Sequence, residues 1–583
     1  MHHKFLPIAK EDLKERGWSR LDIVLITGDA YVDHPSYAAA VIGRVLADAG
    51  FKVGIIAQPD WKKSDDFLKL GKPRLFFGIT AGNLDSILSN YTANRKLRRK
   101  DEYSPGGKMG LRPNRATIVY ANKIKELFPD VQIVIGGIEA SLRRLAHYDW
   151  WSDEVRHSIL LDAKADILVY GMGEKQVVEI ATRLSNGENI EKLDDIRGTA
   201  VIRRNIQGFK GYVTIPSFEE VRTDKDKFNA AFRIAYLECD PFTGKTVIQK
   251  YADRFLVQLP PALPLTTKEL DRIYELDYAR TWHPVYDKDS GVPGFETVRF
   301  SIISHRGCCG ECSFCSLYAH QGRIIQSRSI ESVVREVRRL ADQKYFHGTI
   351  TDIGGPTANL YQAECELWKK TGACRNKICL LPNKCNKLKL GYEKTLSMWG
   401  QVMKIPKVKH VFIGSGLRYD LLLDKSAQPY LLALCKDHIG GQLKVAPEHT
   451  IDSVLRLMNK SPFRVYEEFA QKFMRINENL HKKQFLVNYF ISAHPGSTLH
   501  DSRQMSFDLK NRHIHPEQIQ DFIPLPMTVS SAMYYTAMHP FTGEKIYIPR
   551  SFKERKMQRA FIQYKQPKNK RLIAAALSSP DVV

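Results

Sequence analysis

Three cysteines with tight spacing are the residues of this sequence best suited to chemistry. They follow the pattern Cys308-x3-Cys312-x2-Cys315, and a fourth, Cys309, lies among them. Thiolates are soft ligands that bind iron–sulfur clusters or zinc. A closed zinc site takes four ligands, whereas three thiolates hold a [4Fe–4S] cube with one iron open to another ligand. On spacing alone, a disulfide and chance grouping remain open as well.

Four further cysteines follow in the same region of the chain. Their spacing is C-x8-C-x4-C-x5-C, which matches no standard zinc pattern, although four soft ligands so close in sequence can still close a tetrahedral site. The sequence leaves open three interpretations: unrelated thiols in a helical insertion, an auxiliary metal site, or a second iron–sulfur cluster. The four residues are Cys365, Cys374, Cys379 and Cys385.

The elements that precede these cysteines alternate between apolar runs and amphipathic segments. Segments such as 35–50 and 116–129 have helical spacing of apolar residues. Alternating strands and helices predict a doubly wound parallel α/β sheet, which we place in residues 1–185. The predicted strands are 22–30, 51–59, 74–82, 130–141 and 165–174.

A second strand–helix series predicts a partial (β/α)6 barrel over residues 296–540. Six repeats are fewer than the eight of a closed barrel, so we expect an open one, with Cys308 just after its first strand. Residues 186–295 are interpreted as a connector, and 541–583 as a basic C-terminal tail, loose from about residue 565. The predicted barrel strands are 297–305, 348–356, 408–416, 442–449, 484–495 and 518–526.

The length and net charge of the chain limit the classes of function that it can have. Its 583 residues are too many for one core, and 87 Lys and Arg against 64 Asp and Glu give a formal net charge of +23. Such a charge attracts nucleic acid or covers a solvated surface, and no nucleic-acid-binding motif accompanies it. The sequence lacks a long apolar run and a secretory signal. We therefore expect a cytoplasmic protein with reduced thiols and no membrane partner.

Seven stretches together resemble the YgiQ-type radical S-adenosylmethionine (SAM) family over nearly the whole chain. The cysteine pattern with an aromatic residue, Phe314, before its last cysteine is the hallmark of radical SAM enzymes. The stretches are 22–61, "GGIEASLRR" (136–144), "RGCCGECSFCSLYAHQGR" (306–323), "DIGGPTAN" (352–359), "SGLRYD" (415–420), "KVAPEHT" (444–450) and "ISAHPGST" (491–498).

The resemblance implies that Cys308, Cys312 and Cys315 bind a [4Fe–4S] cluster, with Cys309 a bystander. The open iron would bind the amino and carboxylate groups of SAM. Reductive cleavage of SAM would then give a 5′-deoxyadenosyl radical that abstracts hydrogen from a substrate, a small molecule or an RNA, which the family does not identify. A reductant such as flavodoxin or ferredoxin would supply the electron.

The resemblance also places SAM contacts after the second and third barrel strands. Gly354, Gly355 and Pro356 stand where these enzymes carry a "GGE"-like motif, and Pro replaces its Glu, so that only backbone carbonyls would serve. Ser415 and Arg418 follow strand three, where Arg418 is suited to the SAM carboxylate or to a structural ion pair. No residue is assigned a catalytic role.

The first domain resembles the cobalamin-binding domain of some radical SAM enzymes. The cobalamin-ligand motif there is D-x-H-x-x-G, and here Asp33 and His34 are adjacent, so the motif is not met. We therefore expect a domain that keeps this fold without cobalamin. Two rival functions remain open: an RNA-binding or tRNA-modifying protein that uses its basic surface, and a zinc-stabilised scaffold without catalysis.

Overall fold

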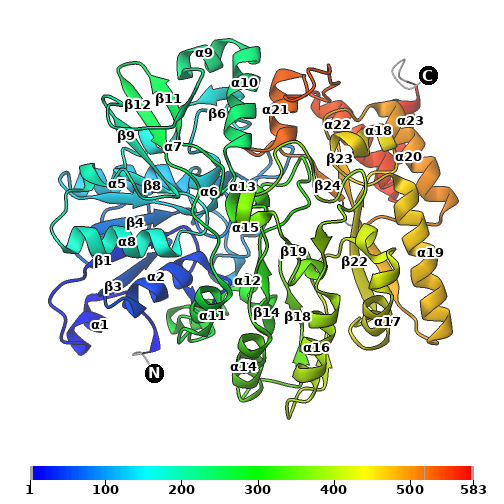
Figure 1. Cartoon of the computed structure of the whole chain (residues 1–583), viewed down its shortest axis with the longest axis horizontal. Helices are drawn as coiled ribbons and strands as arrows, with labels where there is room; N and C mark the ends of the chain where they lie inside the picture. The colour runs from blue at the N-terminus through cyan, green and yellow to red at the C-terminus, as the bar shows by residue number, and fades with distance from the viewer. Residues whose placement is uncertain (1–3, 518, 579–583) are drawn as a thin grey trace. The chain divides into compact units, whose positions relative to one another are not determined.

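The computed structural model of the chain describes residues 4–517 and 519–578. It divides between Arg299 and Phe300 into two units, with Ala319–Gly322 counted in the first. Figure 1 shows both units as mixtures of helices and strands. Within the described residues no helix combines the length and the apolar character that crossing a membrane requires.

The first unit is built on a sheet whose central strands are parallel. The strands are fully or largely buried, as expected when helices cover both faces of a parallel sheet. Helices α2 (Ala38–Asp48), α5 (Ala116–Leu127) and α8 (Glu174–Ser185) alternate with these strands along the chain. The predicted doubly wound sheet is therefore confirmed. In spatial order its strands are β3 (Val53–Ala57), β1 (Ile23–Thr27), β4 (Phe76–Thr80), β5 (Ile133–Ile135) and β8 (Ile167–Val169).

The same sheet continues into the segment expected to be a connector. After β8 come β9 (Thr199–Arg203), β12 (Arg254–Gln258), β11 (Val247–Tyr251) and β10 (Val213–Ile215), which complete nine strands. The pairings β8–β9, β9–β12 and β12–β11 are antiparallel. Residues 186–295 thus differ from the expectation of a connector. They extend the sheet by a β-hairpin and two further strands, which do not repeat the strand–helix alternation of residues 1–185.

The second unit is the open barrel that the sequence predicts. Successive strands pair in parallel: β14 (Ser301–Ile303) with β18 (Asp352–Gly354), and β17 (Thr349–Ile350) with β21 (His410–Val411). An isolated parallel β-bridge pairs Leu417 with Val445, a residue of the last sheet. Among residues 300–517 and 519–578 no ladder joins the last strand to the first. The last sheet holds β22 (Gln442–Glu448), β23 (Phe485–Ser492) and β24 (Ile519–Asp521).

Helices cover the barrel and continue beyond it. Between the strands lie α14 (Ile330–Ala341), α16 (Tyr392–Met403), α17 (Gln428–Asp437), α19 (Phe463–Asn479) and α20 (Leu499–Asn511). The basic tail expected over residues 541–583 forms α22 (Phe552–Ile562), and α23 (Lys570–Leu577) lies in the part expected to be loose, from about residue 565. Met557 and Phe561, four residues apart, bury one face of α22 against Leu499 and Ala576, while its basic residues take the other positions. Residues 579–583 of the predicted tail lie outside the described chain.

Candidate functional site

The cysteine stretch forms a loop at the carboxyl end of the first barrel strand. The short strands β15 (His305–Arg306) and β16 (Gln326–Ser327) flank the loop and pair with each other in antiparallel fashion. Inside the loop, the Ser313 N–H donates to the Met458 carbonyl at 2.9 Å, and the Ser530 N–H donates to the Ser313 carbonyl at 2.9 Å. The loop is therefore fixed from both sides by later parts of the same unit.

The three spaced thiols lie in one short loop and are half-buried. Burial raises the pKa of the Cys308 and Cys315 thiols, and the neighbouring Cys312 raises both further. Ionising several buried thiols next to one another is costly unless a cation is present, and bound iron supplies that charge and deprotonates its thiol ligands. The donor set of three soft, clustered thiols therefore fits an iron–sulfur cluster.

One buried cation already contacts this group. The Nη1 atom of Arg418 lies 3.7 Å from the Cys312 sulfur. Its Nε donates to the Asp420 Oδ1 at 3.0 Å, and its Nη2 donates to the other carboxylate oxygen. The structure thus places Arg418 in a bidentate ion pair, which fixes the guanidinium and leaves Nη1 directed at the thiols. A bound SAM carboxylate would have to share Nη1 with Cys312.

The loop after β18 packs against the first cysteine. The Thr357 hydroxyl lies 3.8 Å from the Cys308 sulfur, and the Thr357 carbonyl is 3.0 Å from the His305 Nε2. A Cβ atom on Gly355 would lie 2.7 Å from the His305 carbonyl, so only glycine fits there. Gly354 is equally confined, because a Cβ atom would overlap the Ser415 hydroxyl.

Gly354 and Ser415 are held by neighbours in the structure. The Gly354 carbonyl accepts from the Ser304 N–H at 2.7 Å and from the Ser304 hydroxyl at 3.0 Å. The Ser415 N–H donates to the Asp352 Oδ1 at 3.0 Å, and its hydroxyl donates to Oδ2. These bonds align strands one, two and three beside the cysteine loop. Pro356 follows in the same turn, between Gly355 and Thr357.

Sequence reasoning singled out neither Asn359 nor Asp420, although both lie in the motif stretches. The Asn359 Nδ2 donates to the Arg418 carbonyl at 2.9 Å, and the Arg418 N–H donates to the Asn359 Oδ1 at 3.0 Å. "DIGGPTAN" therefore clamps "SGLRYD" through a reciprocal pair of bonds. The signal in the sequence was the presence of short polar side chains in both stretches.

A buried carboxyl group completes the site. Glu448 ends β22 at a register shift, in the left-handed region with a φ of 71°, which non-glycine residues rarely adopt. Burial raises its pKa to about 7, against the opposing influence of Lys460 and Arg418. This carboxyl group therefore holds its proton up to near neutral pH.

Two histidines near the strand ends serve packing. Burial lowers the pKa of His449 to about 4 and that of His494 to about 3, so both are neutral. The His494 Nε2 lies 2.6 Å from the Ser530 hydroxyl, and its ring meets Phe314 of the cysteine loop edge-on. His494 thus packs against the cysteine loop through Phe314.

The thiols are not arranged for a single ion. Among the described residues, no three His, Cys, Asp or Glu side chains surround a position suited to one metal ion. That holds for Cys308, Cys312 and Cys315 as well.

Comparison with known proteins decides the family. The family model "Radical SAM N-terminal" matches residues 5–301, and "Domain of unknown function (DUF3362)" matches 517–580. A UPF0313 protein of Clostridium botulinum (strain 657 / Type Ba4) is 50% identical, covering 98% of this chain and 90% of its own. A UPF0313 protein of Methanosarcina acetivorans is 51% identical, covering 98% and 80%. The chain belongs to the UPF0313 family. The resemblance to YgiQ-type radical SAM proteins is thereby confirmed.

A solved structure confirms the fold of this UPF0313 member. The radical SAM methyltransferase TsrM from Kitasatospora setae, with cobalamin and a [4Fe–4S] cluster bound, aligns with a TM-score of 0.50 at 15% identity. The alignment covers 87% of this chain and 76% of TsrM. At this identity the likeness concerns the fold: a mainly parallel sheet followed by a radical SAM barrel.

Proposed function

We propose that the chain is a radical SAM enzyme whose cluster is held by Cys308, Cys312 and Cys315. Such a cluster supplies one electron that cleaves bound SAM, and the resulting 5′-deoxyadenosyl radical removes a hydrogen atom from the substrate. The observation that carries this proposal is the group of three thiols at the carboxyl end of the first barrel strand, with a buried guanidinium 3.7 Å from one sulfur. Barrel enzymes place their active sites at this end.

The protein's own part in this function is binding, orientation and exclusion of water. Arg418, fixed by Asp420, presents positive charge to the cluster ligands and to a SAM carboxylate. The turn from Gly354 to Pro356, held at Cys308 through Thr357, is our candidate for the methionine amino group. Ser415, held by Asp352, is our candidate on the neighbouring strand.

The substrate we propose is a small molecule or an RNA, and the electron donor is a cytoplasmic flavodoxin or ferredoxin. The first unit then serves as a domain with the fold of a cobalamin-binding domain but without the cofactor. Asp33 and His34 support this, because Asp33 pairs with Arg44 and His34 accepts from the Ser36 N–H at 3.1 Å.

The test is anaerobic reconstitution with iron and sulfide, followed by dithionite and SAM. We expect a [4Fe–4S] spectrum and release of 5′-deoxyadenosine from the wild type, and no release of 5′-deoxyadenosine from Cys312→Ala. Cys309→Ala is the matched control, since this neighbouring thiol packs in an apolar cluster and should leave both signals unchanged. A reconstituted Cys312→Ala protein that still releases 5′-deoxyadenosine would contradict the proposal, as would a colourless wild type.

A further inference from the structure

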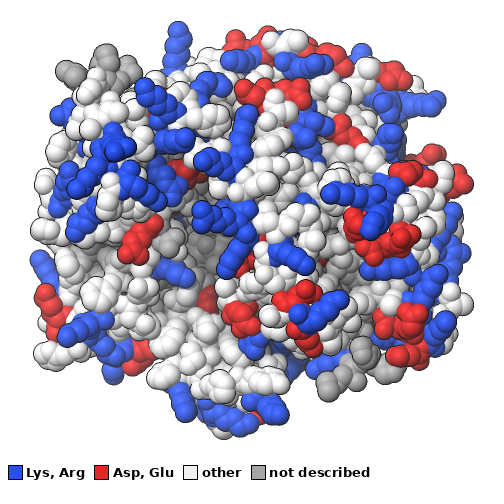
Figure 2. Space-filling view, turned by 180° about the vertical axis from the view of Figure 1, so that it is seen from behind, with Lys and Arg blue, Asp and Glu red and all other residues white. Residues whose placement is uncertain are grey.

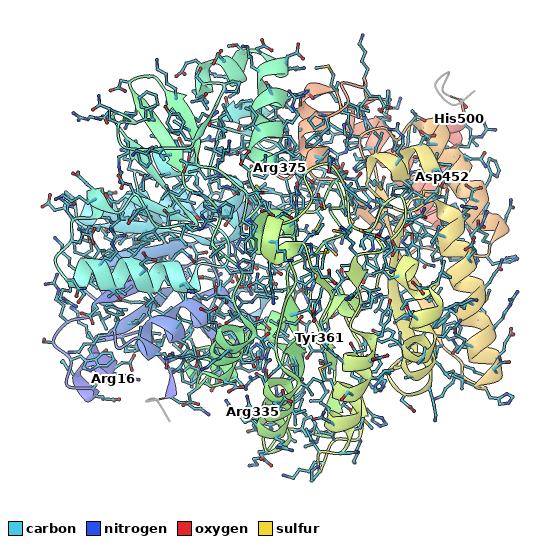
Figure 3. All side chains as sticks on the ribbon, viewed as in Figure 1. Arg16, Arg335, Tyr361, Arg375, Asp452 and His500 are labelled. Atoms are coloured by element: carbon cyan, nitrogen blue, oxygen red, sulfur yellow. The ribbon has the colours of Figure 1, made fainter. Side chains whose placement is uncertain are left out.

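Residues 361–391, the four-cysteine segment, contain little regular structure. The segment holds only β19 (Glu364–Cys365), α15 (Trp368–Thr371) and β20 (Leu388–Lys389). Tyr361, at its start, and Arg375, directly after Cys374, are labelled in Figure 3. A stretch of about thirty residues with so few backbone ladders needs another source of order, and in small scaffolds that source is commonly a metal or a disulfide.

The backbone brings the cysteines of this segment together. In the β19–β20 ladder, Cys365 stands opposite Leu388. The Leu388 N–H donates to the Cys385 carbonyl at 3.1 Å, and the Cys385 N–H donates to the Cys379 carbonyl at 2.8 Å. Three cysteines that are 6 to 20 positions apart in sequence are thus linked by one ladder and one turn.

The fourth cysteine lies in the same neighbourhood. Cys374 precedes Cys379 by five positions and lies in the same irregular stretch between α15 and β20. All four cysteines are half-buried and none forms a disulfide. The segment therefore presents four reduced thiols to one another.

The surrounding side chains suit an anionic centre. The segment carries seven Lys and Arg against two Glu. Both Glu form ion pairs: Glu364 with Lys394 at 2.9 Å, and Glu366 with Lys389 at 3.1 Å. The Lys and Arg of the segment therefore outnumber its Glu even when these two ion pairs are counted. A cluster held by four thiolates is negatively charged, so this local excess of cations stabilises it.

We propose that Cys365, Cys374, Cys379 and Cys385 bind a second [4Fe–4S] cluster. Thiolates in this number select iron–sulfur clusters or zinc. Zinc would bind the same four thiolates in a closed site; the packing of this segment against the apolar cluster that also holds Cys308 and Cys309 of the first site favours the iron–sulfur cluster. The ligands of a cube bind four different irons and stand farther apart. Since all four irons have a cysteine, this cluster would leave no position for SAM.

The second centre lies beside the first. Cys365, Cys379 and Cys385 pack against one apolar cluster that includes Leu380 and Leu388. The same cluster contains Cys309, which is 1% exposed, and touches Cys308 of the first site. The two centres therefore share one wall, which is the arrangement that short-range electron exchange between clusters requires.

The decisive experiment removes the first site and counts what remains. The full-length triple variant Cys308→Ala, Cys312→Ala, Cys315→Ala is reconstituted anaerobically. We expect about four irons and about four sulfides per chain, with a [4Fe–4S] Mössbauer signature, against about eight of each in the wild type. Adding Cys374→Ser and Cys385→Ser should remove the remaining iron. As a matched control, Cys239→Ala in the triple variant should keep it, because Cys239 lies in the first unit. An iron-free triple variant, or one zinc per chain in its place, overturns the proposal.

A second measurement needs no variant. In anaerobic, iron-loaded wild type, the four cysteines should resist iodoacetamide as a set, and should become alkylated after the clusters are bleached with ferricyanide and a chelator. Mass spectrometry of the peptides reads each cysteine separately. Because all four thiols are partly exposed, immediate alkylation of the set in loaded protein overturns the proposal. Neither experiment measures SAM cleavage, so its outcome is independent of the function proposed for the first site.

Discussion

The Arg418 side chain is the buried positive charge that contacts the thiols of the site. It is buried, contacts the Cys312 sulfur and forms a bidentate pair with Asp420. Breaking one half of a buried ion pair leaves the other half uncompensated, whereas removing both halves costs much less.

Arg418→Gln should therefore destabilise the protein by about 3–5 kcal/mol. The double variant Arg418→Gln, Asp420→Asn should recover most of that stability, because no buried charge is then left unpaired. It should still fail to release 5′-deoxyadenosine, since the positive charge beside the thiols is gone. Urea unfolding and product analysis separate the two effects; full activity in the double variant would show that the guanidinium serves only Asp420.

Glu448 gives stability a distinctive pH dependence. Its pKa is raised to about 7 by burial, above its ordinary value. As pH rises from about 4.5 to about 7, the unfolded chain has lost this proton while the folded chain still holds it, so the free energy of unfolding falls. The shift corresponds to up to about 3 kcal/mol across that window.

Glu448→Gln should remove this contribution. In cluster-free protein, the stability of the variant relative to the wild type should increase by up to about 3 kcal/mol between pH 5 and pH 7.5. Urea unfolding at both pH values checks it. A constant difference between the two proteins would mean that Glu448 ionises normally in the folded state.

At this scale the sequence revealed the residues whose spacing is local. Cys308, Cys312 and Cys315 stand out because eight positions contain the whole pattern. Asp420, only two positions from Arg418, did not, because that spacing by itself marks no ion pair. Asn359 did not, because its role arises from contacts with Arg418, which lies 59 positions away. Only folding brings such partners together, and an isolated Asp or Asn has no distinctive pattern.

Among the elements, the loop that carries the cysteines depends on close packing at a glycine. A Cβ atom on Gly310 would lie 2.9 Å from the Arg418 Nη1 and 3.4 Å from the Cys308 sulfur. The loop and the Arg418 strand end thus meet with no room for a side chain.

Gly310→Val should therefore displace Arg418 or Cys308 and lower the iron content after reconstitution by about half, the share of the first cluster, while the circular dichroism of the folded chain stays unchanged. Gly400→Ala, in α16, is the control, because nothing lies within 4 Å of its added Cβ, and it should keep full iron. Normal iron content in Gly310→Val would mean that the loop can retreat from Arg418.

The strands that the sequence predicts are those with an unbroken apolar run. In β1 all five residues are buried, as in a parallel strand covered on both faces. β11, which pairs in parallel with β10 and antiparallel with β12, mixes Gln249 and Lys250 into the strand and was missed. The tail was misjudged for a similar reason: its basic composition hides the Met557 and Phe561 pair that packs α22.

For the whole molecule, the net charge of +23 is the property most open to misinterpretation. In Figure 2, Lys and Arg lie interspersed with Asp and Glu on the face shown. Part of the basic sequence also serves the fold: Arg95 donates to the Trp150 carbonyl at 2.7 Å, and buried Arg555 donates to the Phe522 carbonyl.

We therefore expect RNA binding that depends on charge alone. Affinity for tRNA should fall by about three orders of magnitude between about 50 and 200 mM salt, and an unrelated RNA of equal length should behave alike. Filter binding across a salt series measures this. A tRNA complex that survives 200 mM salt while the control RNA dissociates would instead identify RNA as the substrate.

In the first unit, the residues that follow the parallel strands are held in buried contacts. In open α/β sheets, ligands bind at the carboxyl ends of the parallel strands. Here Asp29, after β1, pairs with buried Arg112 at 2.8 Å, and Arg112 also pairs with Asp101 at 3.1 Å. His34 is fully buried, and its ring meets Phe295 edge-on.

These contacts hold the charged side chains at this edge of the sheet in a buried network, which costs energy to break. We expect hydroxocobalamin added during reconstitution to be lost on desalting, with less than about a tenth of an equivalent retained per chain, and 5′-deoxyadenosine release to be the same with and without it. Visible absorbance and cobalt analysis make the measurement. One tightly held equivalent would contradict the proposal that the first unit works without cobalamin.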